Sequence, residues 1–295
     1  MKVLLDKYPL GSIPRQQTAG RYIDGQLYEN LDILSQKIVN DMTFLAVIFS
    51  STLEVGTGKS VFATQIGEVW SELMKKNHKI DIPFTTKNVV WRPKQLIECA
   101  FQVPKYSYIL LDEWEDAHYW SELGMTLRQF FRKCRQLNLF IMCIIPSWFE
   151  FPKGYALSRS VFAIDVRFEG AFERGYFRFY DFKAKKNLYI KGKKEHNYDV
   201  VRYSFTGRFT DGYGVPKQEY IDAKLSDLKH WEEDEPTPQT STEIKAEFMQ
   251  KFLVKFPNLT TKDLQEITGL SERTIYRYKS REIEGEKQEV APVVV

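Results

Sequence analysis

Residues 44–76 read FLAVIFSSTLEVGTGKSVFATQIGEVWSELMKK and predict the centre of the fold. Residues 44–49 form an apolar run with β-branched members, which is typical of a buried strand. After a loop that contains two glycines, apolar residues from Phe62 to Leu73 recur at spacings of three and four, which predicts an amphipathic helix. A strand, a glycine-containing loop, the letters GKS and a helix, in that order, are the context that a phosphate-binding loop requires.

The loop itself predicts how a triphosphate would be held. Its glycines let the backbone bend so that successive N–H groups point toward phosphate oxygens, and the helix start adds partial positive charge. Lys59 would reach the β- and γ-phosphates, and the hydroxyl of Ser60 would hold Mg²⁺. Leu53 stands where the full pattern GxxxxGK[ST] places its first glycine. The candidate nucleotide-binding residues are Gly56, Thr57, Gly58, Lys59, Ser60 and Val61.

A second motif follows in residues 106–116, which read YSYILLDEWED. Residues 109–111 predict a short buried strand, and Asp112 and Glu113 stand where that strand ends. In P-loop ATPases a strand-end aspartate orders the magnesium shell, and an adjacent glutamate polarises the attacking water. The candidate catalytic residues are therefore Lys59, Asp112 and Glu113, and the alternative is an acidic turn that simply ends a strand.

Composition limits the class of protein. The chain has 295 residues, enough for about two domains, and its net charge of +3 means that nucleic-acid binding would have to rely on local patches. Cys99, Cys134 and Cys143 have no CxxC spacing, which fits a reducing compartment and predicts neither disulfides nor a metal cluster. The N-terminal apolar run is too short for a signal peptide, and no apolar run is long enough to span a membrane. We expect a cytoplasmic protein with no membrane span of its own.

A basic helix is predicted after the acidic pair. In residues 121–138, SELGMTLRQFFRKCRQLN, arginines recur at spacings of three and four and so share one helical face. One arginine could reach the γ-phosphate of a nucleotide bound by a neighbouring subunit, or the row could lie along a phosphodiester backbone. The alternative is a solvated basic face. The candidate arginine fingers are Arg128, Arg132, Arg135 and Arg159.

The apolar run at residues 139–145 predicts another strand, which ends before Ser147. A polar side chain at that end would lie beside the γ-phosphate, so Ser147 is the candidate sensor, with an ordinary turn serine as the alternative. From residue 160 the chain alternates in aromatic-rich runs that predict strands, with a hairpin turn at residues 184–187. Its lysines indicate either a nucleic-acid surface or protection of a sheet edge. They are Lys183, Lys185, Lys186, Lys191, Lys193 and Lys194.

The C-terminal part predicts a separate helical unit. Residues 232–240, EEDEPTPQT, are acidic, contain proline and are typical of a linker. Beyond them, two short helices capped by Thr261 and Ser271 and joined at Gly269 resemble a helix-turn-helix with a basic second helix. Such a unit contacts DNA or docks protein. The candidate DNA-binding residues are Arg273, Thr274, Tyr276, Arg277 and Lys279.

With GTGKS, ILLDE, the basic helix and the strand ending in PS in place, residues 40–230 resemble the additional-strand (ASCE) P-loop ATPases. Within that class they are most similar to the FtsK–HerA group, which includes Zot-like and packaging-type ATPases of viruses and plasmids. The resemblance implies a mostly parallel sheet between helical layers, ATP and Mg²⁺ as ligands, and often a hexameric ring that moves DNA. It implies that Lys59 and Ser60 bind phosphate and magnesium, that Asp112 orders the metal shell and that Glu113 activates water. Ser147 stands where many members have glutamine.

The sequence therefore predicts an α/β P-loop NTPase three-layer sandwich with a β-hairpin-rich extension and a small all-α helix-turn-helix domain. The expected function is a DNA-stimulated ATPase of a mobile genetic element that translocates, packages or remodels DNA, as a homo-oligomer such as a hexamer. The alternatives are a nucleotide-gated DNA-binding regulator or replication accessory protein that does not translocate, and an interaction module that binds nucleotide structurally. The expected parts are an N-terminal arm and lead helix at 1–40, the ATPase domain at 41–230, the linker at 231–240, the helix-turn-helix domain at 241–283 and a disordered tail at 284–295.

Overall fold

The chain divides into two compact units, residues 1–227 and residues 228–295. The computed structural model describes residues 22–52, 56–114, 122–169, 173–229, 260–268, 271–273 and 275.

A seven-stranded sheet, within the described residues, forms the middle of the first unit in the order β2-β3-β4-β1-β5-β6-β7. The strands from β2 to β5 pair in parallel, and β5, β6 and β7 pair antiparallel. The prediction of an α/β chain with a mostly parallel sheet is confirmed. The strands are β1 (Phe44–Phe49), β2 (Val89–Val90), β3 (Tyr108–Leu111), β4 (Phe140–Ile144), β5 (Ser160–Glu169), β6 (Glu173–Tyr180) and β7 (Phe205–Arg208).

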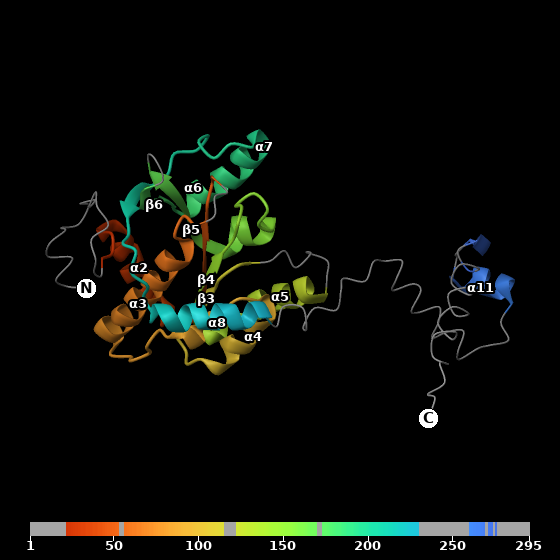
Figure 1. Cartoon of the computed structure of the whole chain (residues 1–295), viewed down its shortest axis with the longest axis horizontal. Helices are drawn as coiled ribbons and strands as arrows, with labels where there is room; N and C mark the ends of the chain where they lie inside the picture. Colours follow the sequence, from red (N-terminus) through yellow and green to blue (C-terminus); the bar gives the residue numbers. More distant parts are fainter. Residues whose placement is uncertain are drawn as a thin grey trace, which may run out of the picture. The chain divides into compact units, whose positions relative to one another are not determined.

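Helices cover both faces of this sheet (Figure 1). Alternate residues of the central strands point to opposite faces. On one face they pack with α2 and α3, and on the other with α4 and α5, so the sheet is the middle layer of three. The α-helices of the first unit are α2 (Gly25–Ile38), α3 (Lys59–His78), α4 (Pro93–Gln102), α5 (Glu122–Lys133), α6 (Phe182–Asn187), α7 (Lys193–Glu195) and α8 (Lys217–Lys229).

The register of the central strands decides which loops meet. Phe44 of β1 and Tyr108 of β3 both pair with Phe140 of β4, and β4 lies between the other two strands. Because the three strands are parallel and level, the residues that follow β1 and β3 emerge at the same edge of the sheet. The predicted face of α3 is also confirmed, since its residues Phe62 and Trp70 are fully buried in the core.

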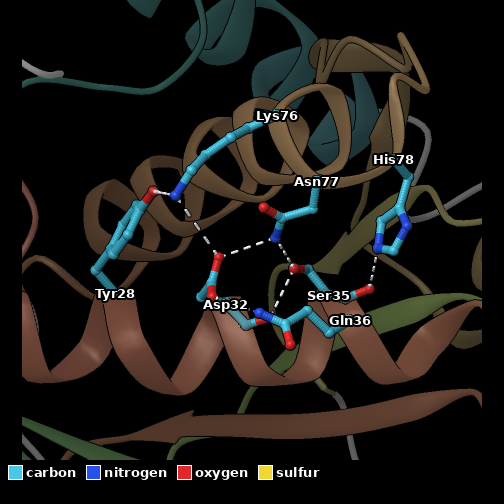
Figure 2. A network of polar contacts seen from close by, with 7 residues as sticks. All are labelled: Tyr28, Asp32, Ser35, Gln36, Lys76, Asn77 and His78. Carbon is cyan, nitrogen blue, oxygen red and sulfur yellow. Dashed lines mark hydrogen bonds and ion pairs between the residues drawn. The ribbon is translucent and has the colours of Figure 1, made fainter.

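Helix α2 is fixed to α3 by apolar contacts and by a polar network along their outer edges (Figure 2). The amide of Asn77 donates to Asp32 Oδ1 at 2.9 Å and to Ser35 Oγ at 2.8 Å, and Lys76 Nζ donates to the Tyr28 hydroxyl at 3.1 Å. His78 Nε2 lies 2.9 Å from the Ser35 carbonyl oxygen. The network joins the lead helix to the helix that begins at GKS.

Residues 1–26 show no clear periodicity in the sequence and predict an arm that lies on the surface, but this prediction is wrong for residues 22–25, which are buried. Tyr22 and Ile23 are buried, and Asp24 caps α2 by accepting from the N–H groups of Gln26 and Leu27. Residues 1–21 lie outside the described residues. The last residues of this segment therefore belong to the folded unit, and Ile23 is part of its apolar core.

The predicted hairpin turn at residues 184–187 is also wrong, because this segment is helical in α6 and continues through a π-helical turn, η4 (Leu188–Gly192). The Asp181 carboxylate caps α6 by accepting from the N–H groups of Lys183 and Ala184. Lys185 is fully buried, and its ammonium donates to two carbonyl oxygens of a neighbouring π-helical turn, η3 (Tyr155–Arg159). It therefore cannot belong to the basic surface that the sequence indicated.

Candidate active site

The GTGKS turn, residues 56–60, occupies the start of α3. Gly56 and Gly58 have φ of +82° and +98°, in the left-handed region that side chains disfavour, and Gly58 caps the helix. A Cβ on Gly58 would lie 3.1 Å from the ring of Phe209. The turn thus needs glycine both for its curvature and for space. Leu53 lies outside the described residues.

The acidic pair lies at the end of β3, at the sheet edge where β1 also ends. Asp112 is 1% exposed, and its N–H donates to the Val90 carbonyl at 2.8 Å. Glu113 is exposed and has a φ of +86°, an uncommon conformation for a glutamate. The next residue returns to the core, because the N–H of Trp114 donates to the Ile144 carbonyl at 2.7 Å. Backbone hydrogen bonds on both sides of Glu113 therefore fix the turn that carries the two carboxylates.

The two sequence motifs are in direct contact. Ser60 Oγ donates a hydrogen bond to Asp112 Oδ1 at 2.9 Å. Serine and aspartate oxygens are ligands of the type that Mg²⁺ prefers, and a magnesium site typically takes one or two protein oxygens and completes its shell with phosphate and water. Ser60 Oγ and Asp112 Oδ1 could therefore serve as the protein oxygens of a magnesium site. The described residues contain no group of three or more His, Cys, Asp or Glu side chains placed to hold a metal.

Two further features of the turn fit a bound anion. The Thr57 hydroxyl is buried and has no hydrogen-bond partner among the described residues. Burial lowers the pKa of Lys59, while Asp112, Glu113 and Asp165 oppose that shift. The three carboxylates thus favour the charged form of Lys59, and burial opposes it. Val61 follows within the first turn of α3.

Helix α8 adds residues that sequence reasoning missed. The Tyr220 hydroxyl donates to Asp112 Oδ2, and Lys224 Nζ lies 2.6 Å from Glu113 Oε1 and 3.6 Å from Asp112 Oδ2. Burial alone would lower the pKa of Lys224, but the two carboxylates outweigh burial and raise it. Burial and Asp112 raise the pKa of Tyr220. The four-residue spacing shows that both side chains share a helical face, but no local signal shows which surface that face meets.

Asp165 of β5 is a second residue that the sequence did not reveal. Its buried carboxylate accepts from the Ser51 N–H at 2.8 Å and from the Ser51 hydroxyl at 2.7 Å. Burial raises the pKa of Asp165, and the bonds from Ser51 oppose that shift. Ser51 follows β1, so Asp165 fixes the direction in which the chain leaves the strand toward the GTGKS turn.

The arginine-finger candidates divide into two sets. Arg128, Arg132 and Arg159 line an open pocket of about 430 Å³ whose floor includes Phe131 and Tyr155. Arg135 instead pairs with Asp41, with Nη2 and Oδ2 3.0 Å apart on the surface. The lining of the pocket includes neither the GTGKS turn nor the acidic pair. The pocket is linked to the acidic pair through Trp114, the residue after Glu113, whose ring centroid lies 5.6 Å from that of Tyr155 and 6.5 Å from that of Phe131.

Ser147 is buried just beyond β4, and its side chain forms a hydrogen bond with Tyr198. Its hydroxyl lies 3.1 Å from the hydroxyl of Tyr198, and the Tyr198 ring stacks on Phe149 at 4.1 Å between centroids. The preceding Ile145 N–H donates to the Ile48 carbonyl at 2.9 Å, which places this segment at the same sheet edge. Ser147 is near the candidate site in the fold, with its side chain engaged by Tyr198.

The second unit is described in part. Helix α11 (Thr261–Thr268) begins one residue after Thr260, whose hydroxyl and N–H bond the Asp263 carboxylate at 2.6 and 2.8 Å. Thr260 is therefore the cap, and the expectation of Thr261 is wrong. Arg273 is exposed, and Ile275 after it is buried. The other DNA-binding candidates, Thr274, Tyr276, Arg277 and Lys279, lie outside the described residues.

In the part of the chain that the structure describes, no helix is both long and apolar enough to cross a membrane. Comparison with known proteins found no matching family model, no matching curated protein and no matching solved structure.

Proposed function

We propose that this chain is an ATPase of the additional-strand P-loop class that couples hydrolysis to moving or remodelling DNA for a virus or plasmid. The hydrogen bond from Ser60 to Asp112 carries the proposal, because it joins the two motifs that the resemblance requires at one magnesium ion. The sheet order supports it as well. One strand, β4, lies between β1, which precedes the GTGKS turn, and β3, which ends in the acidic pair.

The residues of the site would divide the chemistry as follows. The amides of the GTGKS turn and Lys59 would hold the phosphates of ATP, and Ser60 and Asp112 would hold Mg²⁺. The ion supplies positive charge to the phosphoryl oxygens. Glu113 would accept a proton from the attacking water while the bond from the γ-phosphorus to the β–γ bridging oxygen breaks, which gives ADP and phosphate.

The DNA-directed part of the proposal depends on the C-terminal unit. Its capped helix α11 and the exposed Arg273 agree with a helix-turn-helix that tethers a cytoplasmic ATPase to DNA. We further propose a homo-oligomer, in which an arginine of the pocket between α5 and η3 would act on a nucleotide bound by a neighbouring chain.

A second candidate function is a nucleotide-gated DNA-binding switch that does not translocate. One observation favours it. Lys224 of α8 forms an ion pair with Glu113, and the second compact unit begins at Leu228 within the same helix. Nucleotide binding at the first unit would then act directly on the helix that leads to the second.

The deciding experiment measures ATP turnover with and without double-stranded DNA, together with the mass of the protein in solution. DNA-stimulated turnover by an oligomer supports the motor, and slow turnover that ignores DNA supports the switch. Lys59→Ala is the control for the site. Turnover by Lys59→Ala equal to that of the wild type, at an ATP concentration well below wild-type saturation, would show that hydrolysis occurs elsewhere and would reject the proposal.

A further inference from the structure

Helix α8 contacts the acidic pair through polar side chains, and its residues Tyr220 and Ile221 also pack against the apolar core. Within this helix Tyr220 is the residue that is buried. Near the other end, Asp227 accepts from Arg92 Nε at 3.3 Å and from Gln95 Nε2 at 2.7 Å. The side chains of Arg92 and Asp227 are each 15% exposed, so this contact is largely shielded from solvent.

The face of α8 toward the acidic pair engages both carboxylates. Tyr220 donates to Asp112 Oδ2, and one turn later Lys224 Nζ lies 2.6 Å from Glu113 Oε1 and 3.6 Å from Asp112 Oδ2. Ser60 takes the remaining oxygen of Asp112. The carboxylates of Asp112 and Glu113 thus both accept hydrogen bonds from other side chains of the protein.

These are the oxygens that the proposed hydrolysis requires. The Asp112 carboxylate would have to interact with the magnesium ion and its shell, and the Glu113 carboxylate would have to be free to accept a proton from water. A magnesium ion beside Asp112 would bring two positive charges close to the Lys224 ammonium, and like charges at that distance repel. The ion and the ammonium therefore cannot both occupy their best positions.

We propose that Lys224 is a positioning residue that holds Asp112 and Glu113 in a resting arrangement and competes with Mg²⁺ for them. This inference rests on the proposed ATPase function. The left-handed backbone at Glu113 agrees with it, because a glutamate keeps a φ of +86° where its surroundings hold it there. Loading the site with magnesium and nucleotide then requires the Lys224 ammonium to move away from the two carboxylates.

The test is the magnesium dependence of nucleotide binding by the full-length chain. Binding of a fluorescent ATP analogue is titrated at a series of Mg²⁺ concentrations and, separately, in EDTA. We expect Lys224→Met to lower the half-saturating Mg²⁺ concentration about tenfold, which is a typical size for coupling between two ligands. Lys224→Arg keeps the charge and should resemble the wild type. Lys217→Met, at an exposed position of the same helix, is the matched control.

The possible results separate the inference from the function beneath it. Binding in EDTA should be the same in the wild type and in Lys224→Met, since the competition concerns the metal. Nucleotide binding that depends on Lys59, with identical Mg²⁺ dependence in both proteins, would overturn the inference alone. A higher Mg²⁺ requirement in Lys224→Met would also overturn it. Absence of nucleotide binding by the wild type would reject the proposed function and the inference together.

A second variant covers the case in which Lys224→Met fails to fold. Tyr220→Phe removes the hydroxyl that holds Asp112 and keeps the buried ring between Tyr213 and Trp91. It should lower the half-saturating Mg²⁺ concentration in the same direction by about two- to tenfold, as expected for one net hydrogen bond. An unchanged value in folded Tyr220→Phe would contradict the resting arrangement.

Discussion

The hydroxyl of Ser60 and the carboxylate of Asp112 form a 2.9 Å hydrogen bond, although the two residues stand 52 positions apart in the chain. Strands β1 and β3, which deliver them, do not pair with each other. The contact exists because β4 pairs in parallel with both and keeps their ends level.

Removing the Lys59 ammonium should weaken nucleotide binding. A hydrogen bond to a charged group contributes about 1.5–3 kcal/mol, so Lys59→Ala should lower ATP affinity about 10- to 100-fold. The measurement is a titration with a fluorescent ATP analogue. Lys75→Ala, which removes an exposed lysine of the same helix paired with Asp81, should bind as the wild type does. Equal affinity in Lys59→Ala and Lys75→Ala would show that the GTGKS turn does not bind nucleotide.

Neutralising Glu113 should separate binding from turnover. Glu113→Gln keeps the shape of the side chain but removes the base, so hydrolysis should slow by about 10²- to 10⁴-fold while ATP affinity stays close to that of the wild type. Steady-state phosphate release and equilibrium binding give the two quantities. Glu98→Gln, at an exposed position of α4, is the control. Normal phosphate release by Glu113→Gln would remove Glu113 from its assigned role.

A side chain at Gly58 should destabilise the first unit. Gly58→Ala places a Cβ 3.1 Å from the Phe209 ring at a φ of +98°, and backbone strain of this kind costs about 1–3 kcal/mol. Urea unfolding followed by tryptophan fluorescence measures the difference. Gly154→Ala is the comparison, because its Cβ would meet open space and its φ is −64°. The two variants should therefore differ clearly, and equal stability would show that the turn relaxes around alanine.

The buried Lys185 should make the free energy of unfolding vary with pH between about pH 7 and pH 10.5. Burial, with a smaller effect of Lys186, lowers the pKa of Lys185 from 10.5 to about 7 in the folded chain. Between these values the unfolded chain binds the extra proton, so this group makes the free energy of unfolding increase as pH rises, by at most about 1.4 kcal/mol per pH unit.

Lys185→Met removes that dependence. The difference in unfolding free energy between the wild type and Lys185→Met should therefore shift in favour of the wild type from pH 7 to pH 9. Lys183→Met, at an exposed position of the same helix, should leave the pH profile unchanged. A difference that stays constant with pH would show that Lys185 is protonated equally in both states.

The sequence alone predicted the elements whose signals are local. The apolar run of β1, the three-and-four spacing of α3 and the strand that precedes Asp112 each depend on residues within one segment, and each is confirmed. Local reasoning failed at residues 182–192, because a cap from Asp181 and burial of Lys185 favoured helix over the alternating pattern. The cap involves adjacent residues, but the burial depends on η3, which is distant in sequence.

The composition of the candidate site was decided by tertiary structure. The sequence supplied Lys59, Ser60, Asp112 and Glu113, since their types and their places beside a strand and a helix already indicate phosphate and metal chemistry. It could not supply Lys224 or Asp165, because each acts through a side chain that meets its partner only after the sheet has formed. Strand order and register bring those partners together, and neither is encoded in the spacing of residues along a single segment.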